Sequence, residues 1–382
     1  MDAITKAATN SAAEAEYTLY ALPHSYYSGK VRSYLRYKRI PYREETATLR
    51  LFNNFIVPRT GVKYIPVVQT PDDVVLQDST DIIDFLEARF PQRPVYPATP
   101  RQKLATLLFE LYGDEWLVLP AMHYRWSFWH ERAHINDVLE HFGMLLSPHA
   151  PRRLRRFAGK QFCRPFSGAL PMLGITSENI PALEAWYGEF MRDMDAHFAA
   201  HPYLLGGRAS MGDFGLIGPL FAHLGRDFVP KAMMQAQAPR LYQWVQRMNG
   251  APQPGEFLPD DAVPETLLPV LRRMFAEHVP VLLDTVRRLE TWLKENPQRK
   301  IPRAIGEHEF SLGGVRASRR IFPYAQWMLQ RPLDYYQSLR GAEREPVDAL
   351  LREVGGYEAM QIRIRYRLRR VHNRIVADPP RA

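Results

Sequence analysis

The chain has 382 residues, too many for one average domain, with 46% hydrophobic and 24% charged residues, which is ordinary for a soluble globular protein. Its formal charge of +9 is modest for this length and bears on solubility and anionic ligands rather than on fold. Its single cysteine, Cys163, excludes an internal disulfide, a CxxC redox pair and a zinc cluster built on cysteines. No apolar run reaches the length of about 18 residues that a membrane span requires, so we expect no span and a cytoplasmic location.

The first part of the chain alternates strand and helix patterns and is typical of a compact α/β unit. Residues 1–15 are rich in Ala, Thr, Ser and Asn, which predicts a loose tail without a secretory signal. The elements predicted after it are a strand at 16–22, a helix at 28–38, a strand at 41–46, a hairpin of 64–69 with 74–76, and a helix from Thr80 that Ser79 caps.

Two proline-rich stretches, 91–100 and 252–264, predict boundaries further along the chain. Between them the apolar residues recur at helical spacing. Beyond the second stretch we expect a helix or helical pair at 267–294 and a hairpin at 307–318 around Gly313 and Gly314.

Four segments carry a family resemblance, in a definite order. Ser25-Tyr26-Tyr27-Ser28 and Gly29-Lys30-Val31-Arg32 follow the first strand, Ile65-Pro66 opens the hairpin, Asp78-Ser79 precedes the next helix, and a Pro-Tyr-Leu-Leu-Gly run with Ser-x-x-Asp lies within 201–220. In this order the segments resemble the glutathione transferase family. The later helix at 238–248 is similar to the family as well.

The resemblance implies an α/β N-terminal thioredoxin-like domain followed by an all-α domain of the glutathione S-transferase C-terminal type. A mainly helical C-terminal extension lies outside it. The expected division is a tail at 1–15, a glutathione-binding domain at 16–92, a helical domain at 100–250 and an extension of unknown role at 265–382. The family also implies a homodimer.

The resemblance makes Ser25 the expected donor to the thiolate of glutathione, which is a co-substrate here. A free thiol has a pKa near 8.5, and lowering it by about two units requires roughly 2.7 kcal/mol. A helix N-terminus supplies about 0.3–1 kcal/mol and a hydrogen bond to a charged group about 1.5–3 kcal/mol, so a hydroxyl is needed. Ser28 is the second candidate, Tyr26 or Tyr27 could also donate, and a plain helix cap is the alternative role for Ser25.

The resemblance assigns the rest of glutathione to four residues. A cis peptide is implied at Ile65-Pro66, where the backbone would pair with the cysteinyl unit in the manner of an added strand. Asp78 suits the ammonium of the γ-glutamyl end, while Ser79 at a helix N-terminus suits its carboxylate.

An apolar electrophile would complete the reaction, held against the helical domain. The side chains expected near it are Tyr112, Trp116 and His123, although core packing suits each of them too. The function favoured by the sequence is therefore that of a serine-type glutathione transferase. The first alternative is a non-catalytic binding or scaffold protein of the same fold, because the same fold serves many functions.

A second alternative is a zinc-dependent hydrolase, because His130-Glu131-x-x-His134 matches the HExxH motif. On one helix both histidines would share a face and Glu131 would act as base, with His141 or Glu140 as the third ligand. Short motifs of this kind have a high false-positive rate, so we expect no metal.

A basic tail, 362–370, alternates apolar residues with arginine, as an edge strand or a charged helix would. Such a segment can meet nucleic acid, anionic lipid or a protein partner. The favoured interpretation is a solvated face packed on the body of the protein, so a nucleic-acid partner is not expected.

Overall fold

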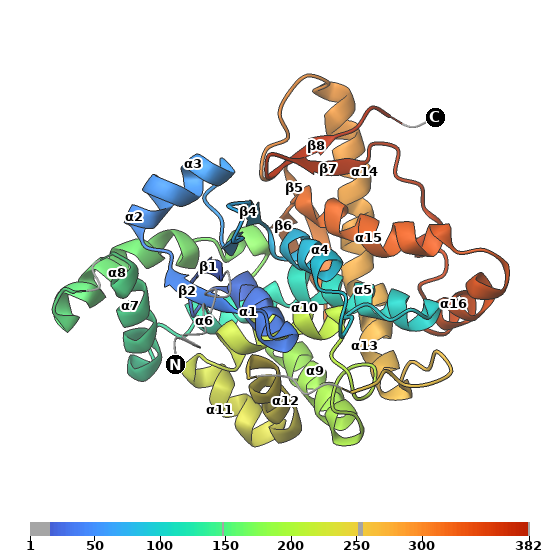
Figure 1. Cartoon of the computed structure of the whole chain (residues 1–382), viewed down its shortest axis with the longest axis horizontal. Coiled ribbons are helices and arrows are strands. Elements are labelled where there is room, and N and C mark those ends of the chain that lie inside the picture. Colours follow the sequence, from blue (N-terminus) through green and yellow to red (C-terminus); the bar gives the residue numbers. More distant parts are fainter. Residues whose placement is uncertain (1–15, 147–148, 251–254, 381–382) are drawn as a thin grey trace, which may run out of the picture.

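The structure is a computed structural model that describes residues 16–146, 149–250 and 255–380 (Figure 1). The predicted tail at 1–15 lies outside these residues. The N-terminal unit holds a four-stranded sheet in the order β2-β1-β3-β4, with β2 parallel to β1 and the other neighbours antiparallel. The strands are β1 (Tyr17–Ala21), β2 (Tyr42–Thr46), β3 (Val67–Gln69) and β4 (Val75–Gln77). The helices are α1 (Tyr26–Lys38), α2 (Leu49–Leu51), α3 (Val57–Thr60) and α4 (Ser79–Arg89).

The central strand β1 is buried along its whole length, because both faces of the sheet are covered. Tyr17 and Leu19 pack in the main core, whereas Tyr20 and Leu22 enter a second apolar cluster together with residues of α6 and α7. Successive side chains of a strand point to opposite faces, which explains this division. The first predicted strand and helix are confirmed within two residues, and the predicted hairpin is confirmed with its first strand beginning three residues later, at Val67.

The helical part begins at α5 and is organised around one fully buried helix, α10, whose every residue is inaccessible to solvent. Two glycines let it approach α5: a Cβ on Gly113 would lie 2.5 Å from the Gly215 carbonyl carbon. The Ser-x-x-Asp pattern noted in the sequence is Ser210 to Asp213, and these two residues form a capping box at the start of the helix. The helices are α5 (Pro100–Glu115), α6 (Val118–Trp126), α7 (Arg132–Leu146), α8 (Arg152–Ser167), α9 (Ile180–Ala200), α10 (Met211–Pro219), α11 (Phe228–Gln237) and α12 (Pro239–Asn249).

The remaining elements pack on the first two parts and share their core, which includes Leu271, Phe310 and Met328 (Figure 1). The predicted hairpin is confirmed, with Leu312 paired to Val315 across Gly313 and Gly314. The elements are α13 (Leu268–Arg273), α14 (Val279–Glu295), β5 (Glu307–Leu312), β6 (Val315–Arg320), α15 (Tyr324–Ser338), α16 (Gly341–Glu353), β7 (Leu368–Val371) and β8 (Arg374–Ala377). The predicted division at 16–92, 100–250 and 265–382 stays a prediction.

None of the helices in the described ranges is both long and apolar enough to cross a bilayer. In the basic tail only residues 368–370 are in a strand: they begin β7, which pairs with β8 in a two-stranded sheet.

Candidate functional site

The Ser25 hydroxyl stands at the N-terminus of α1 without a partner among the described residues. Ser25 is the N-cap residue, with extended backbone angles (φ −83°, ψ 125°), yet its side chain makes no capping hydrogen bond. Only its backbone is engaged, since its N–H donates to the Leu22 carbonyl at 3.1 Å. A half-buried hydroxyl beside the unpaired N–H groups of a helix start is well suited to donate to an anion.

The other candidate donors near Ser25 are placed differently. Ser28 is fully buried, and its Oγ has no hydrogen-bond partner within the described chain. Tyr26 donates its hydroxyl to the Gly113 carbonyl, and Tyr27 donates to the Asp114 carbonyl at 3.0 Å. Burial raises the pKa of both tyrosines well above its usual value. Both phenols therefore hold α1 against α5 and are occupied.

The peptide bond between Ile65 and Pro66 is cis, as the resemblance implied. This bond directly precedes β3. The N–H and C=O of Ile65 make no backbone hydrogen bond to any residue in the described ranges. The backbone here is therefore free to pair with an extended ligand.

Asp78, and not Ser79 as predicted, is the N-cap of α4. Its carboxylate accepts from the Thr80 N–H at 2.9 Å, while its backbone has the unusual angle φ 89°. Asp78 can cap the helix because one of its carboxylate oxygens accepts from backbone N–H groups of the first turn. Ser79 is the first helical residue, buried, and its hydroxyl bonds to no described side chain or backbone group.

Residues of the C-terminal part lie directly on this end of α4. The Tyr324 hydroxyl donates to the second Asp78 oxygen at 2.6 Å. The buried Arg370 guanidinium donates to the Gln77 carbonyl at 3.0 Å, to the Gln77 Oε1 at 2.5 Å and to the Asp81 carboxylate. Arg370 also lies 3.8 Å from Asp78. The basic tail thus meets an acidic edge of this same chain.

The hairpin tip between β7 and β8 makes two further contacts with the N-terminal unit. Asn373 donates to the Thr60 carbonyl at 2.9 Å, and Arg374 donates to the Gly61 carbonyl at 3.0 Å. These carbonyls belong to the last residue of α3 and to the residue after it, a few residues before Ile65. The C-terminal hairpin therefore spans from α4 to the loop that leads into the cis peptide.

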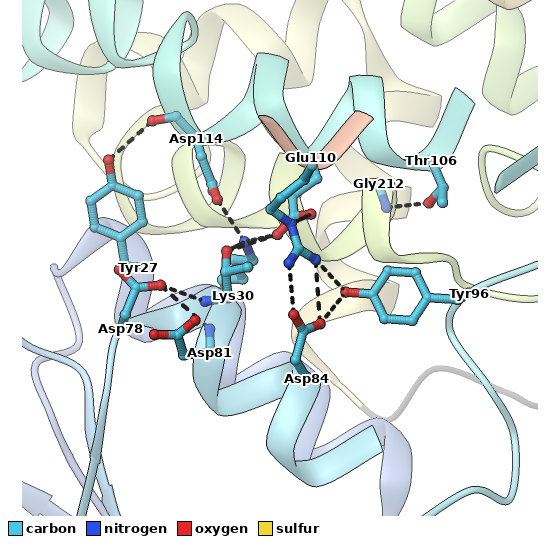
Figure 2. Close-up of polar contacts among 12 residues, drawn as sticks. Tyr27, Lys30, Asp78, Asp81, Asp84, Tyr96, Thr106, Glu110, Asp114 and Gly212 are labelled. Atoms are coloured by element: carbon cyan, nitrogen blue, oxygen red, sulfur yellow. Dashed lines mark hydrogen bonds and ion pairs between the residues drawn. The ribbon is translucent and has the colours of Figure 1, made fainter. Parts of the chain in front are cut away.

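A buried charge network lies next to Asp78 and joins the N-terminal unit, the helical part and the C-terminal part of the chain (Figure 2). The Lys30 ammonium is 2.8 Å from Glu110, 2.6 Å from Asp114 and 3.1 Å from the Thr80 hydroxyl. Arg331 continues the network at 3.3 Å from Glu110. Burial alone lowers the pKa of Lys30, but the carboxylates of Asp114 and Glu110 outweigh it and raise the pKa. The network holds α1, α4, α5 and α15 in fixed positions.

The three side chains expected to line an electrophile pocket are buried in the core instead. Tyr112 and Trp116 are inaccessible, and His278 stacks on the Trp116 ring at 4.9 Å between centroids. His123 is bound by Ser127 at 2.9 Å and Glu184 at 3.0 Å. Tyr112 and Trp116 are covered by residues of the C-terminal part, which the resemblance does not reach.

Two cavities in the described part of the chain lie within the C-terminal part or at its edge. The larger, about 550 Å³, lies between α14 and β5, with Asp284 and His308 in its lining. The smaller, about 10 Å³, lies beside Glu115, His278 and Arg319, and fits one water molecule. Neither cavity is lined by Ser25 or Asp78.

The structure does not arrange the HExxH histidines in the way that the zinc interpretation requires. His130 is exposed (71%) and precedes α7, whereas His134 is buried within α7 and bonds to the Arg125 carbonyl at 2.8 Å. The two rings therefore do not share a helix face. Among the described residues, another group of three potential metal ligands does converge. One histidine of this group already accepts a hydrogen bond from the Arg226 side chain at 2.9 Å. The group is His24, Asp137 and His141.

Comparison with known proteins agrees with this geometry in the N-terminal unit. Residues 19–94 match the family model described as the glutathione S-transferase N-terminal domain. No curated protein matches the chain. Solved structures with a similar arrangement include the glutathione S-transferase of Rhodospirillum rubrum F11, at 15% identity and TM-score 0.39, over 65% of this chain and 96% of that one.

Two further solved structures have a similar sequence identity and TM-score. The glutathione S-transferase of Methylobacterium radiotolerans, solved with glutathione sulfonate, is 18% identical at TM-score 0.38, over 65% of this chain and 100% of the other. The glutathione transferase GSTFuA3 of Phanerochaete chrysosporium is 17% identical at TM-score 0.42, over 61% and 96%.

Proposed function

Residues 19–94 belong to the glutathione S-transferase N-terminal domain family, and from this premise we propose that the chain binds reduced glutathione along the Ser25, Ile65 and Asp78 edge. The observation that carries the proposal is the unengaged Ser25 hydroxyl at the start of α1. In the proposed complex Ser25 donates to the glutathione sulfur, and the helix N-terminus adds its partial positive charge. Together they favour the thiolate, which is the nucleophile.

The backbone of Ile65 would hold the cysteinyl unit of glutathione. Its free N–H and C=O suit the pairing of an added strand, and the cis bond to Pro66 sets their direction. This contact specifies a peptide-like ligand and supplies no chemistry of its own.

The γ-glutamyl end would bind at the start of α4. The Ser79 hydroxyl at the start of the helix suits its carboxylate, while Asp78 suits its ammonium. One oxygen of Asp78 is already bonded to Tyr324 and lies near Arg370, so the ammonium shares or displaces these partners. We therefore propose that glutathione binds more weakly here than at an uncovered site.

The reaction proposed is transfer of the thiolate to an apolar electrophile. Ser28 remains the second candidate for the donor, but its burial favours Ser25. Tyr112, Trp116 and His123 contribute to the core, so the proposal assigns no pocket to the electrophile. A homodimer and a cytoplasmic location accompany the proposal on the strength of the family alone.

A second candidate function is a non-catalytic binding protein of the same fold. It is favoured by one observation: Tyr324 and Arg370 already satisfy the acidic edge where glutathione would bind. If this contact is permanent, the fold serves as a scaffold for the C-terminal part.

Calorimetric titration of the full chain with reduced glutathione tests the proposal, repeated on Ser79→Ala and on Ser127→Ala as a matched control. The proposal expects binding that Ser79→Ala weakens and Ser127→Ala leaves unchanged. Activity toward 1-chloro-2,4-dinitrobenzene then separates the two functions. Absence of binding at high millimolar glutathione would overturn the transferase proposal and favour the scaffold.

A further inference from the structure

The outer face of α8 carries cations and large apolar side chains together. Within Arg152–Ser167 there are six basic residues and no acidic residue. Leu154 and Phe157 are 60% and 66% exposed, the two most exposed large apolar side chains of the described chain. They lie on one side of the helix, since positions three apart are neighbours on its surface.

The opposite face of α8 is fixed to the body of the protein. A Cβ on Gly159 would lie 2.1 Å from the Leu139 carbonyl of α7, and one on Gly143 would lie 1.9 Å from the Arg155 carbonyl, so both glycines are needed for the close approach. Cys163 is buried in the cluster that joins α7 and α8 to the N-terminal unit. The helix is therefore a rigid platform and its outer face is preformed.

The charges of α8 are poorly compensated. Arg152, Arg155 and Arg156 all turn toward Glu140 of α7, at 2.5, 3.1 and 3.8 Å. One carboxylate faces three guanidinium groups, and Arg153 and Lys160 have no ion-pair partner among the described residues. Both stand at the border of the apolar patch of Leu154 and Phe157. This surface attracts anions.

We propose that α8 docks in the plane of an anionic lipid bilayer, with Leu154 and Phe157 inserted among the acyl chains and Arg153 and Lys160 at the headgroups. A helix with apolar side chains on one side and cations beside them is suited to the boundary between headgroups and acyl chains. Each cation near an anionic leaflet adds to binding, and long basic side chains reach the phosphates. This inference does not rest on glutathione binding.

Other occupants fit this face less well. A second copy of the chain would bring two basic faces together, and like charges repel across an interface. A nucleic acid would use the cations, but it would leave two large apolar side chains in water. An anionic bilayer accepts both kinds of side chain over the same few ångströms.

Co-sedimentation of the full chain with vesicles tests the proposal, using phosphatidylcholine alone and phosphatidylcholine with phosphatidylglycerol. The proposal expects binding to the mixed vesicles only, weakened by salt because exposed charges are screened. Arg153→Glu with Lys160→Glu should weaken binding at least about thirtyfold. Leu154→Ser with Phe157→Ser should weaken it about tenfold or more.

Matched controls carry the same changes elsewhere: Arg299→Glu with Lys300→Glu, and Phe228→Ser, all at exposed positions. They should bind as the unaltered chain does. Circular dichroism melting of every variant confirms that the fold is retained. Equal sedimentation with both kinds of vesicle would overturn the proposal. The proposal would also be overturned if duplex DNA displaced the chain from the vesicles while the Leu154 and Phe157 variant bound them unchanged. A dimer in solution that this variant dissociates would overturn it as well.

Discussion

The Tyr324 hydroxyl donates a hydrogen bond of 2.6 Å to the Asp78 carboxylate, across 246 residues of sequence. Asp78 caps α4 with its other oxygen, so one carboxylate serves the N-terminal unit and the C-terminal part at once. The aspartate proposed to hold an ammonium therefore already has a partner from within the chain.

Replacing Tyr324 by phenylalanine is expected to tighten glutathione binding. The change frees one oxygen of Asp78 for the ligand ammonium, and a hydrogen bond to a charged group contributes about 1.5–3 kcal/mol, so a gain of a few-fold to tenfold is expected after partial compensation by water. Calorimetric titration measures it, with Tyr335→Phe as the control. Weaker binding would mean that Tyr324 contacts the ligand and does not compete with it.

Replacing Ser25 by alanine is expected to lower conjugation at neutral pH by about tenfold to a hundredfold, since the thiolate loses a hydrogen bond of about 1.5–3 kcal/mol. Glutathione affinity should change little, because most of its contacts lie elsewhere. The apparent pKa of bound glutathione, followed by thiolate absorbance, should rise. Ser28→Ala is the control, since its buried hydroxyl has no partner among the described residues. Equal losses in the two variants would contradict the assignment.

Replacing Lys30 by methionine is expected to lower the free energy of unfolding by about 3–5 kcal/mol. The change leaves the buried carboxylates of Glu110 and Asp114 without their nearest cation. Urea unfolding followed by circular dichroism provides the measurement. The exposed Lys300→Met should change stability by less than about 0.5 kcal/mol. A comparably small effect of Lys30→Met would show that water reaches the network.

The contribution of Glu115 to the free energy of unfolding is expected to fall as pH rises from about 4.5 to about 8. Burial, together with the Asp114 carboxylate, raises the pKa of Glu115 to about 8, against the opposing influence of Arg319. The folded state then holds a proton that the unfolded state releases above its ordinary pKa of 4.5. The contribution of this proton to the free energy of unfolding is complete below pH 4.5 and is lost as the pH rises through the pKa that Glu115 has in the folded state.

Urea unfolding at several pH values tests this dependence, for which one group gives a slope of at most about 1.4 kcal/mol per pH unit. Glu115→Gln should flatten the curve in this window. Glu290→Gln, on α14, should leave it as it is. An unaltered slope in Glu115→Gln would assign the effect to Asp114, whose pKa burial raises to about 7.

The local elements could be predicted because their signals are local. The aromatic and apolar content of residues 16–22 specifies a strand, the two glycines at 313 and 314 specify a turn, and the spacing of Ser210 and Asp213 specifies a cap. The sequence predicts the cap of α4 one residue too late, because Asp78 and Ser79 are both good caps and only the backbone angle of Asp78 decides between them.

The contacts over long separations could not be predicted from one sequence. Lys30 stands within the Gly29 to Arg32 signature, but nothing near it shows that Glu110 and Asp114 are its partners. Arg370 looks like one of several solvated arginines until β7 places it against Gln77 and Asp81. The HExxH pattern was misleading because α7 starts at Arg132, after the first histidine of the motif.

The network around Lys30 also sets an order of events during synthesis. Lys30 leaves the ribosome about eighty residues before Glu110 and Asp114, and Arg331 follows about two hundred residues later still. A buried ammonium without a carboxylate is strongly disfavoured, so the nascent N-terminal unit has to keep this side chain in water. We expect that unit to stay loosely packed around α1 and α4 until α5 arrives, and to reach its final form only when α15 brings the last cation.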